Sequence, residues 1–512
     1  MDLRPVQGLR DDQRRLPHVT AKSTGDHASN STPDPSGSSD VESHRRPLRN
    51  AAIAFFSALL FLIILRLSWG WYAHRQIQQI IALAHRQHEP ASVEDLAAQA
   101  SPSPTGAAAV YMSATTHLKL STPRWTGPKS YLALPAADDA TGNKMAGDVA
   151  RNAALLAQLR SARSLPTGFW GPPLVHPVRS AFLLRFSGIF QLSNLLAWQL
   201  CLEHVKGNDD EALETAQDWL KYGQVIDARA GLGGLRWSAL AIQRDALEAL
   251  RAIAPSLRIS ENSTEGSVSR QQVKGLIEKL LDEREVQEGG ARAWLFMRVV
   301  ALDEAQPDEV DVHAGNALLG RLLQPAFDLR AARDARRANA FATAASWPNL
   351  PEAQNHLPAE VEQVEPWLQS AARAQVDYDR LDPSQISEQF HVLTERRATA
   401  TILAMRLYAE DHDGQYPQAL SQLVPKYLPD LPIDPMAAKN RPLLYQMPKG
   451  PRATVFLYSV GNNGIDDGGP AAHVPVRDVG DGLWVQADVI FAVPPTSTQI
   501  ALPSTRQAQD HN

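Results

Sequence analysis

An uninterrupted apolar run near the N-terminal end constrains this chain more than any other feature. Residues 51–65 contain no charged side chain, and Arg66 follows at the far end, where a long side chain can reach the membrane surface. Three aromatic side chains between residues 69 and 72 are typical of the boundary between lipid and water. About 20 residues of this kind are long enough to cross a hydrocarbon core. We therefore expect a single transmembrane helix over residues 51–72.

The charges beside this run predict its orientation. Arg45, Arg46 and Arg49 precede it, whereas Arg75 is the nearest cation beyond the aromatic side chains. The positive-inside rule then places the N-terminal tail in the bacterial cytoplasm and everything after residue 75 outside the cytoplasmic membrane. A cleaved signal peptide is disfavoured, because the apolar run begins about fifty residues in and no Ala-x-Ala site follows it. A buried helix of a soluble protein is the other alternative, and the flanking Arg and Trp side chains argue against it.

Composition excludes several classes of protein. The formal net charge of the 512 residues is −6, without the strong basic excess that a nucleic-acid partner requires. Cys201 is the single cysteine, so no disulfide forms within one chain and no cysteine-based metal site exists. Its apolar helical surroundings predict a buried, inert thiol.

The length and the pattern of apolar residues predict several domains. The expected fold is a single N-terminal transmembrane helix, a mostly α-helical middle domain and a small α+β C-terminal domain. Residues 1–49 and 496–512 are polar, so we expect disordered tails there. The remaining boundaries are a juxtamembrane helix and linker over 73–142, the helical domain over 143–380 and the α+β domain over 385–495. Helices are expected over 149–159, 180–205, 209–225, 235–253, 270–283, 291–302, 314–322, 325–340 and 360–378, and irregular structure over 107–142, 255–268 and 341–358.

The C-terminal stretch has the most informative pattern. An amphipathic helix is predicted over 390–410, and Asp413-Gly414 with Pro417 ends it. Strands are expected near 443–445, 454–460 and 484–491. The Gly-rich loop over 461–469 requires a positive φ at several positions.

Three pieces of this stretch resemble the globular end of the major (G-type) pseudopilin of type II secretion: the helix end with residues 413–417, the turn over 431–435 and the segment over 457–464. This resemblance implies a small α+β fold, calcium bound by the C-terminal loops and a secretion or pilus-like assembly as partner. The chain departs from that family because no Gly-Phe-Thr-Leu-Ile-Glu-like processing site occurs and the apolar run lies over 300 residues upstream. The remainder resembles a group of bacterial membrane-anchored envelope proteins with no known activity.

The acidic loop is the candidate metal site. Asp466 and Asp467 offer hard oxygen ligands for Ca²⁺, and Asp488 adds a third if the loop folds back towards it. The segment over 470–482, which is longer than in the pseudopilins, separates Asp488 from the other two aspartates. The alternative is an Asp/Gly turn without metal. His391 and Glu395, one helical turn apart, are expected to be an exposed pair, and residues 410–413 a solvated acidic turn.

No phosphate-binding loop, dinucleotide fingerprint, zinc-protease motif or serine-hydrolase motif occurs in the sequence. We therefore expect a non-enzymatic, membrane-anchored envelope protein with a scaffold or protein-interaction role. One alternative is a working component of a type II secretion or pilus-like machine. Another is an enzyme with a cleft in the helical domain, for which the candidate residues are Trp170, His176, Arg179, Trp198 and Trp237.

Overall fold

The computed structural model divides the chain into two compact units, Met1–Leu67 and Ser68–Asn512. The residues that it describes are 40–99, 106–121, 140–168, 174–178, 187–227, 233–262, 265–309, 316–357, 384–448, 453–471, 484 and 488–496. The first unit holds the beginning of helix α1 (Asp40–Arg86), which starts within the segment expected to be a disordered tail. Among the described residues, one helical stretch, Arg49–Arg86, is long and apolar enough to cross a membrane. The expected span lies inside it, and its most apolar window contains no buried residue.

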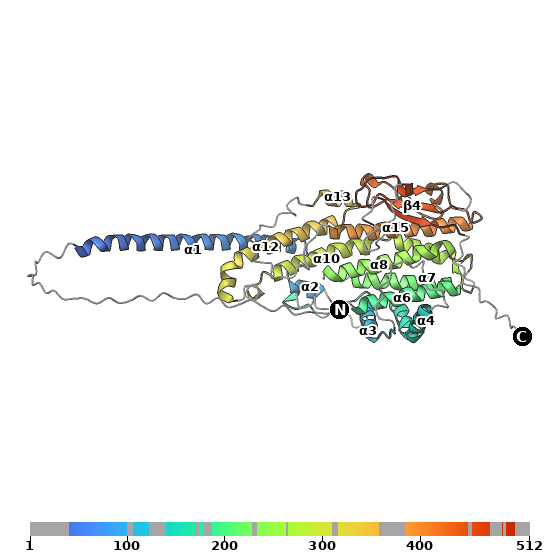
Figure 1. Cartoon of the computed structure of the whole chain (residues 1–512), viewed down its shortest axis with the longest axis horizontal. Helices are drawn as coiled ribbons and strands as arrows, with labels where there is room; N and C mark the ends of the chain where they lie inside the picture. The colour runs from blue at the N-terminus through green and yellow to red at the C-terminus, as the bar shows by residue number, and fades with distance from the viewer. Residues whose placement is uncertain are drawn as a thin grey trace, which may run out of the picture. The chain divides into compact units, whose positions relative to one another are not determined.

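The second unit is mostly helical, as expected, with a small sheet near its C-terminal end (Figure 1). Before the C-terminal part, its helices include the end of α1, α2 (Val93–Gln99), α3 (Ala107–His117), α4 (Ala140–Arg151), α5 (Ala153–Ala162), α6 (Ser187–Lys206), α7 (Asp209–Asp227), α8 (Gly233–Ile253), α9 (Arg270–Leu281), α10 (Arg284–Asp303), α12 (Ala317–Ala344) and α13 (Leu350–Asn355).

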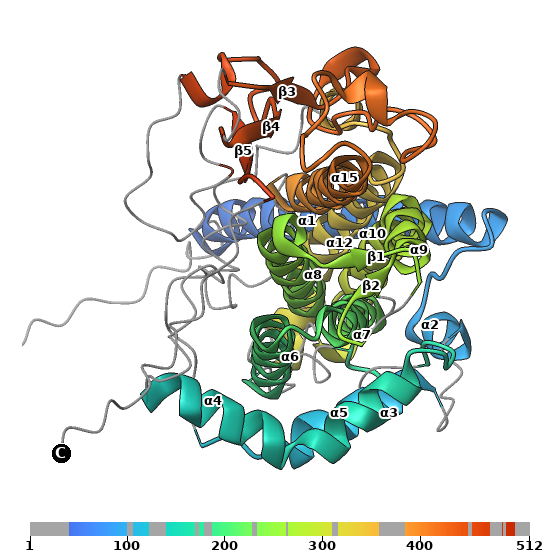
Figure 2. The same cartoon turned by 90° about the vertical axis from the view of Figure 1, so that its right-hand side faces the viewer.

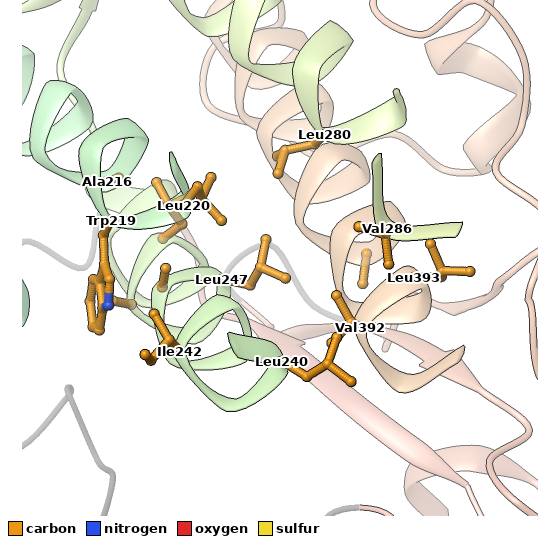
Figure 3. Packing of buried hydrophobic residues seen from close by; sticks show 14 of the residues in the cluster. Ala216, Trp219, Leu220, Leu240, Ile242, Leu247, Leu280, Val286, Val392 and Leu393 are labelled. Atoms are coloured by element: carbon orange, nitrogen blue, oxygen red, sulfur yellow. The ribbon is translucent and has the colours of Figure 1, made fainter. Parts of the chain in front are cut away.

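Helices α6, α7 and α8 pack through a continuous apolar core. Figure 3 shows Ala216, Trp219 and Leu220 of α7 beside Ile242 and Leu247 of α8. A polar atom inside this core has a partner, since the Trp219 indole N–H donates to Ser193 Oγ at 2.8 Å. Large side chains excluded from water supply the main stabilising term for such a bundle.

Several local expectations were wrong. The stretch after residue 107 contains helix α3 rather than irregular structure, and the helix expected over 149–159 is divided at Asn152 into α4 and α5. The Asn152 side chain donates to the carbonyl oxygens of Lys119 and Asp148 at 2.9 and 2.7 Å and accepts from the Lys119 N–H, which fixes this break.

The two helices expected over 314–322 and 325–340 form one helix, α12, with Pro325 inside it. The helix continues into the segment expected to be a loop over 341–358, which also contains α13. A ring contact joins α12 to α10, with Trp294 and Phe341 stacked at 4.5 Å. The loop expected over 255–268 contains a 3₁₀ turn, η2 (Ala254–Ser256), and short strand β1 (Ile259–Ser260), which pairs in parallel with β2 (Val268–Ser269). The helix expected over 360–378 lies outside the described residues.

The C-terminal part has the predicted order of elements. Helix α15 (Ser384–Glu410) ends where Asp413 and Gly414 take positive φ values of 50° and 79°. Short turns η5 (Leu420–Leu423) and η6 (Ala438–Asn440) follow, then β3 (Leu444–Gln446), β4 (Val455–Ser459), η7 (Gly469–Ala471) and β5 (Val489–Val493). The three strands form an antiparallel sheet in the order β3-β4-β5, with Leu457 opposite both Tyr445 and Phe491. Figure 2 shows α15 between this sheet and helices α8 and α9.

Candidate functional site

The acidic loop is closed by hydrogen bonds within the chain. Asp466 Oδ2 accepts from Arg441 Nη2 at 2.6 Å, and its Oδ1 accepts from the Gly468 N–H at 3.2 Å. Asp467 Oδ2 accepts from Asn463 Nδ2 at 2.8 Å. Positive φ angles at Gly461, Gly464, Gly468 and Gly469 allow the tight path, as the sequence predicted.

Asp488 lies behind this loop and fastens it. Its Oδ2 accepts from the backbone N–H groups of Asp467 and Gly469 at 3.1 and 2.7 Å, so the loop does fold back towards Asp488. Its Oδ1 is buried, and no described residue donates a hydrogen bond to it. The three carboxylates nevertheless do not converge, because Asp466 binds Arg441 instead. In addition, the part of the chain that the structure describes contains no group of three or more potential metal ligands from His, Cys, Asp and Glu. In this arrangement the residues do not fit a three-carboxylate calcium site, and calcium stays a prediction.

Asp434, in the turn over 431–435, joins that turn to the sheet. Its Oδ1 accepts from the Met436 N–H at 3.0 Å and from Ser459 Oγ at 2.8 Å, and its Oδ2 accepts from the Val460 N–H at 3.0 Å. Burial raises the pKa of this carboxyl group despite those donors. Two of the three pieces that carry the pseudopilin resemblance, the turn and the end of β4, are therefore held together by one side chain.

A set of charged side chains, one buried and three half-buried, joins α15 to α8. We call Arg244, Arg251, Glu388 and Glu395 the charged seam. Arg244 Nε lies 3.0 Å from Glu395 Oε1, and its Nη1 lies 3.0 Å from Glu388 Oε2. Arg251 Nη2 binds the other oxygen of Glu395 at 3.0 Å. Burial alone would raise the pKa of Glu395, but the charges of Arg251 and Arg244 outweigh it, so this pKa lies below its ordinary value.

Two further arginines of α15 extend these contacts to α9. Arg396 is buried and donates to three backbone carbonyl oxygens, those of Lys279, Leu280 and Asp282, at 2.7, 3.1 and 2.9 Å. These belong to the end of α9, where helical carbonyls lack partners within the helix. Arg397 pairs with both carboxylate oxygens of Glu283, at 2.7 and 2.6 Å.

The expected exposed pair of His391 and Glu395 is wrong, because both side chains are buried and each has other partners. His391 stacks on the Trp484 ring at 3.8 Å, and its Nε2 lies 2.7 Å from Asn462 Oδ1. Asn462 Nδ2 in turn donates to the Trp484 carbonyl oxygen at 3.0 Å. This cluster holds the loop after β4 against α15.

Sequence reasoning missed the charged seam, although a signal for it exists. Arg244 and Arg251 are seven residues apart on α8, and Glu388 and Glu395 are seven residues apart on α15. Seven residues are close to two helical turns, so each pair lies on one face of its helix. Matching spacings of opposite charge on two helices predict that those faces meet.

The candidate residues for a cleft occupy different places. Trp198 of α6 is buried in the apolar core, and Trp237 of α8 is exposed. Trp170 and Arg179 lie outside the described residues. His176 lies at the end of α10, with its Nδ1 2.7 Å from Asp303 Oδ1 and its Nε2 2.8 Å from an Asp308 carboxylate oxygen. Hydrogen bonds to Asp303 and Asp308 raise the pKa of His176 to about 9, so it is charged at neutral pH and suited to a structural ion pair rather than to accepting a proton.

Cys201 is buried, and burial raises the pKa of its thiol to about 12. The thiolate, which is the reactive form, is therefore disfavoured at neutral pH, as the sequence predicted.

Comparisons of this chain with protein-family models, with curated proteins and with solved structures find no match.

Proposed function

We propose that this protein is a non-enzymatic scaffold anchored in the bacterial cytoplasmic membrane, with a pseudopilin-like α+β module used for recognition rather than for building a pilus. The burial of α15 carries this proposal. From Ile386 to Ala409 every residue is buried except Ser387, Glu388, Arg397 and Tyr408, which are half-buried. A subunit that joined an assembly through α15 would have to leave one face of this helix free for its neighbours. Here the same chain covers that helix on both the sheet side and the side of α8 and α9 (Figure 2).

Hydrogen exchange on the full-length chain tests this point. We expect the amides of α15 to be among the most protected in the protein, because they exchange only when the surrounding unit opens. Exchange of α15 as fast as that of the short helix α13 would mean that the helix is released from the bundle in solution. That result would overturn the scaffold proposal and favour the alternative of a component that joins a secretion or pilus-like assembly.

The proposed topology places residues 1–49 in the cytoplasm and the second unit in the periplasm. Its support is the exposed apolar helix together with Arg45, Arg46 and Arg49 before it. Membrane lipid is then the first partner, and a secretion or pilus-like protein is the proposed protein partner.

Cysteine labelling in cells tests the orientation. Cys201 is buried, so wild-type protein should react little with a membrane-impermeant maleimide and serves as the control. We expect Ile465→Cys, at an exposed position of the acidic loop, to be labelled in cells whose outer membrane has been permeabilised. Ser36→Cys should be labelled only after the inner membrane is lysed. The reverse pattern would overturn the topology.

A further inference from the structure

The first turns of α12 have their apolar side chains on the outside. Leu318, Leu319 and Leu322 are 73%, 41% and 52% exposed, and their spacing places them on one face of the helix. Gly320, on the opposite face, is buried. The Asn316 side chain caps this end by accepting from the Leu319 N–H at 2.8 Å. A soluble surface helix has the reverse arrangement, with its apolar face inside.

Contacts along α10 show towards which end of the unit this segment points. Arg298 donates to Asn339 of α12 at 2.7 Å, whereas the Ala305 carbonyl oxygen accepts from Gln324 of α12 at 2.8 Å. Moving from residue 298 of α10 to residue 305, just beyond its end, therefore leads back towards the start of α12.

The same movement along α10 leads back along α1. Arg298 pairs with Glu89, just after α1, at 2.6 Å, and Leu302 packs with Ile80 of α1. The C-terminal end of α10 therefore lies beside the earlier residues of both α1 and α12. The first turns of α12 and the part of α1 before Ile80 are thus at the same end of the second unit. That is the end at which α1 leads into the apolar span.

Two aromatic residues mark the membrane boundary at this end. Trp71 and Tyr72 of α1 are exposed, and the Arg75 guanidinium lies 5.3 Å from the Trp71 ring centre. Such aromatic and cationic side chains lie at the level of the lipid headgroups. Figure 1 shows that α12 is bent near its first turns. Pro325 lies inside the helix and accounts for a bend.

We propose that residues 317–323 of α12 lie in the headgroup layer of the same membrane, as a second lipid contact that does not span it. Residues 316–327 contain no acidic side chain and one cation, Arg321, which suits a surface of anionic phospholipid. A second contact beside the span fixes the tilt and rotation of the helical unit above the bilayer. This inference rests on the membrane anchorage proposed above.

Fluorescence quenching in vesicles of zwitterionic and anionic phospholipid tests it on the full-length chain. In a Cys201→Ala background, an environment-sensitive dye is attached to Leu318→Cys or Leu322→Cys. Leu60→Cys, in the apolar span, is the positive control, and Ile465→Cys, exposed on the acidic loop, is the control for a position in water. We expect quenchers attached to lipid to reduce emission at positions 318 and 322 several-fold more than at 465. A water-soluble quencher should show the opposite order.

The controls separate the possible outcomes. Quenching by lipid at Leu60 but not at Leu318 or Leu322 would overturn this inference and leave the anchorage intact. Absence of lipid quenching at Leu60 as well would overturn the anchorage. Efficient disulfide formation between Leu318→Cys copies, with protection from both quenchers, would assign the patch to a second copy and overturn the lipid contact.

A second variant checks that the patch is not needed for folding. Because the side chains are exposed, Leu318→Ser with Leu322→Ser should melt in detergent within a degree or two of wild type. In vesicles, a dye on Leu319→Cys should lose its lipid quenching in this double variant but keep it in the matched Leu318→Ile, Leu322→Ile protein. Equal quenching in the two proteins would contradict the inference.

Discussion

Helix α8 packs against two neighbours by different means. Its contact with α7 is close and mainly apolar, with Gly223 of α7 against Gln243 and Ala239, and it includes an ion pair between Asp227 of α7 and Arg236 of α8. Its contact with α15 includes the charged seam, where Glu395 binds two arginines of α8. Apolar burial is non-directional and tolerates repacking, whereas a buried ion pair requires each partner in place. The difference suggests that the α7 side supplies stability and that the α15 side fixes where the C-terminal part docks.

Removing the central acid of the seam should have the largest effect. Glu395→Ala leaves Arg244 and Arg251 partly buried without their main partner, so we expect a loss of about 3–5 kcal/mol in the free energy of unfolding. Urea denaturation of the full-length chain in detergent measures it. Glu388→Ala, at a more exposed position with Arg244 as its arginine partner, is the matched control and should cost less. Equal losses would mean that the seam does not depend on Glu395.

The apolar contact should respond to size rather than to chemical identity. Leu247→Ala opens a cavity between α7 and α8 and should cost about 2–5 kcal/mol, whereas Leu247→Met should cost less than about 1.5 kcal/mol. Glu395→Gln, a change of similarly small size, should cost more than Leu247→Met. If the two conservative changes cost the same, the contrast between the two faces of α8 is not real.

A substitution at Asp434 measures the effect of a buried carboxylate that has no ion-pair partner, because its hydrogen-bond donors are neutral groups. Asp434→Asn keeps the shape but loses acceptor capacity for the N–H groups of Met436 and Val460 and the Ser459 hydroxyl. We expect a loss of about 1–3 kcal/mol, confined in hydrogen exchange to the turn over 431–436 and the end of β4. Loss of protection in α8 would instead connect this carboxyl group to the seam.

His176 takes part in an ion pair at the edge of the unit, and replacing it should have a smaller, pH-dependent effect on stability. Its pKa in the folded protein is about 9, above the ordinary value of 6.5. Its contribution to stability is therefore complete below pH 6.5 and is lost as the pH rises through about 9. The difference in melting temperature between wild type and His176→Gln should shrink over that range. A constant difference would show that charge on His176 is not involved.

Calcium should have the smallest effect. Asp466 must leave Arg441 before it can bind a metal, so we expect only weak binding, as in extracellular modules. Millimolar calcium should raise the melting temperature by about one to two degrees, and by more in Arg441→Ala. Asp488→Asn should abolish the rise. No rise in either wild type or Arg441→Ala would contradict the sequence-based calcium prediction.

Sequence patterns predicted the elements that are determined by residues close together in the chain. The apolar run near residue 51, the turn at Asp413-Gly414 and the strand of residues 455–459 all depend on neighbouring residues, and the structure has them close to where they were expected. The contacts of Glu395 were not predicted, since its partners lie 144 and 151 residues away in the chain. The path of α12 through Pro325 was missed for a related reason. Packing against α10 and α1 stabilises a helix that the local pattern would interrupt.

Arg396 has a consequence for the order of events during biosynthesis. The carbonyl groups at the end of α9 receive this side chain from a residue 116 positions later than Leu280. At about 5–20 residues per second, the ribosome adds Arg396 on the order of ten seconds after the end of α9. The nascent bundle must wait through that interval with those carbonyl groups open to water or to a chaperone. Completion of the helical unit is therefore timed by the emergence of the C-terminal module.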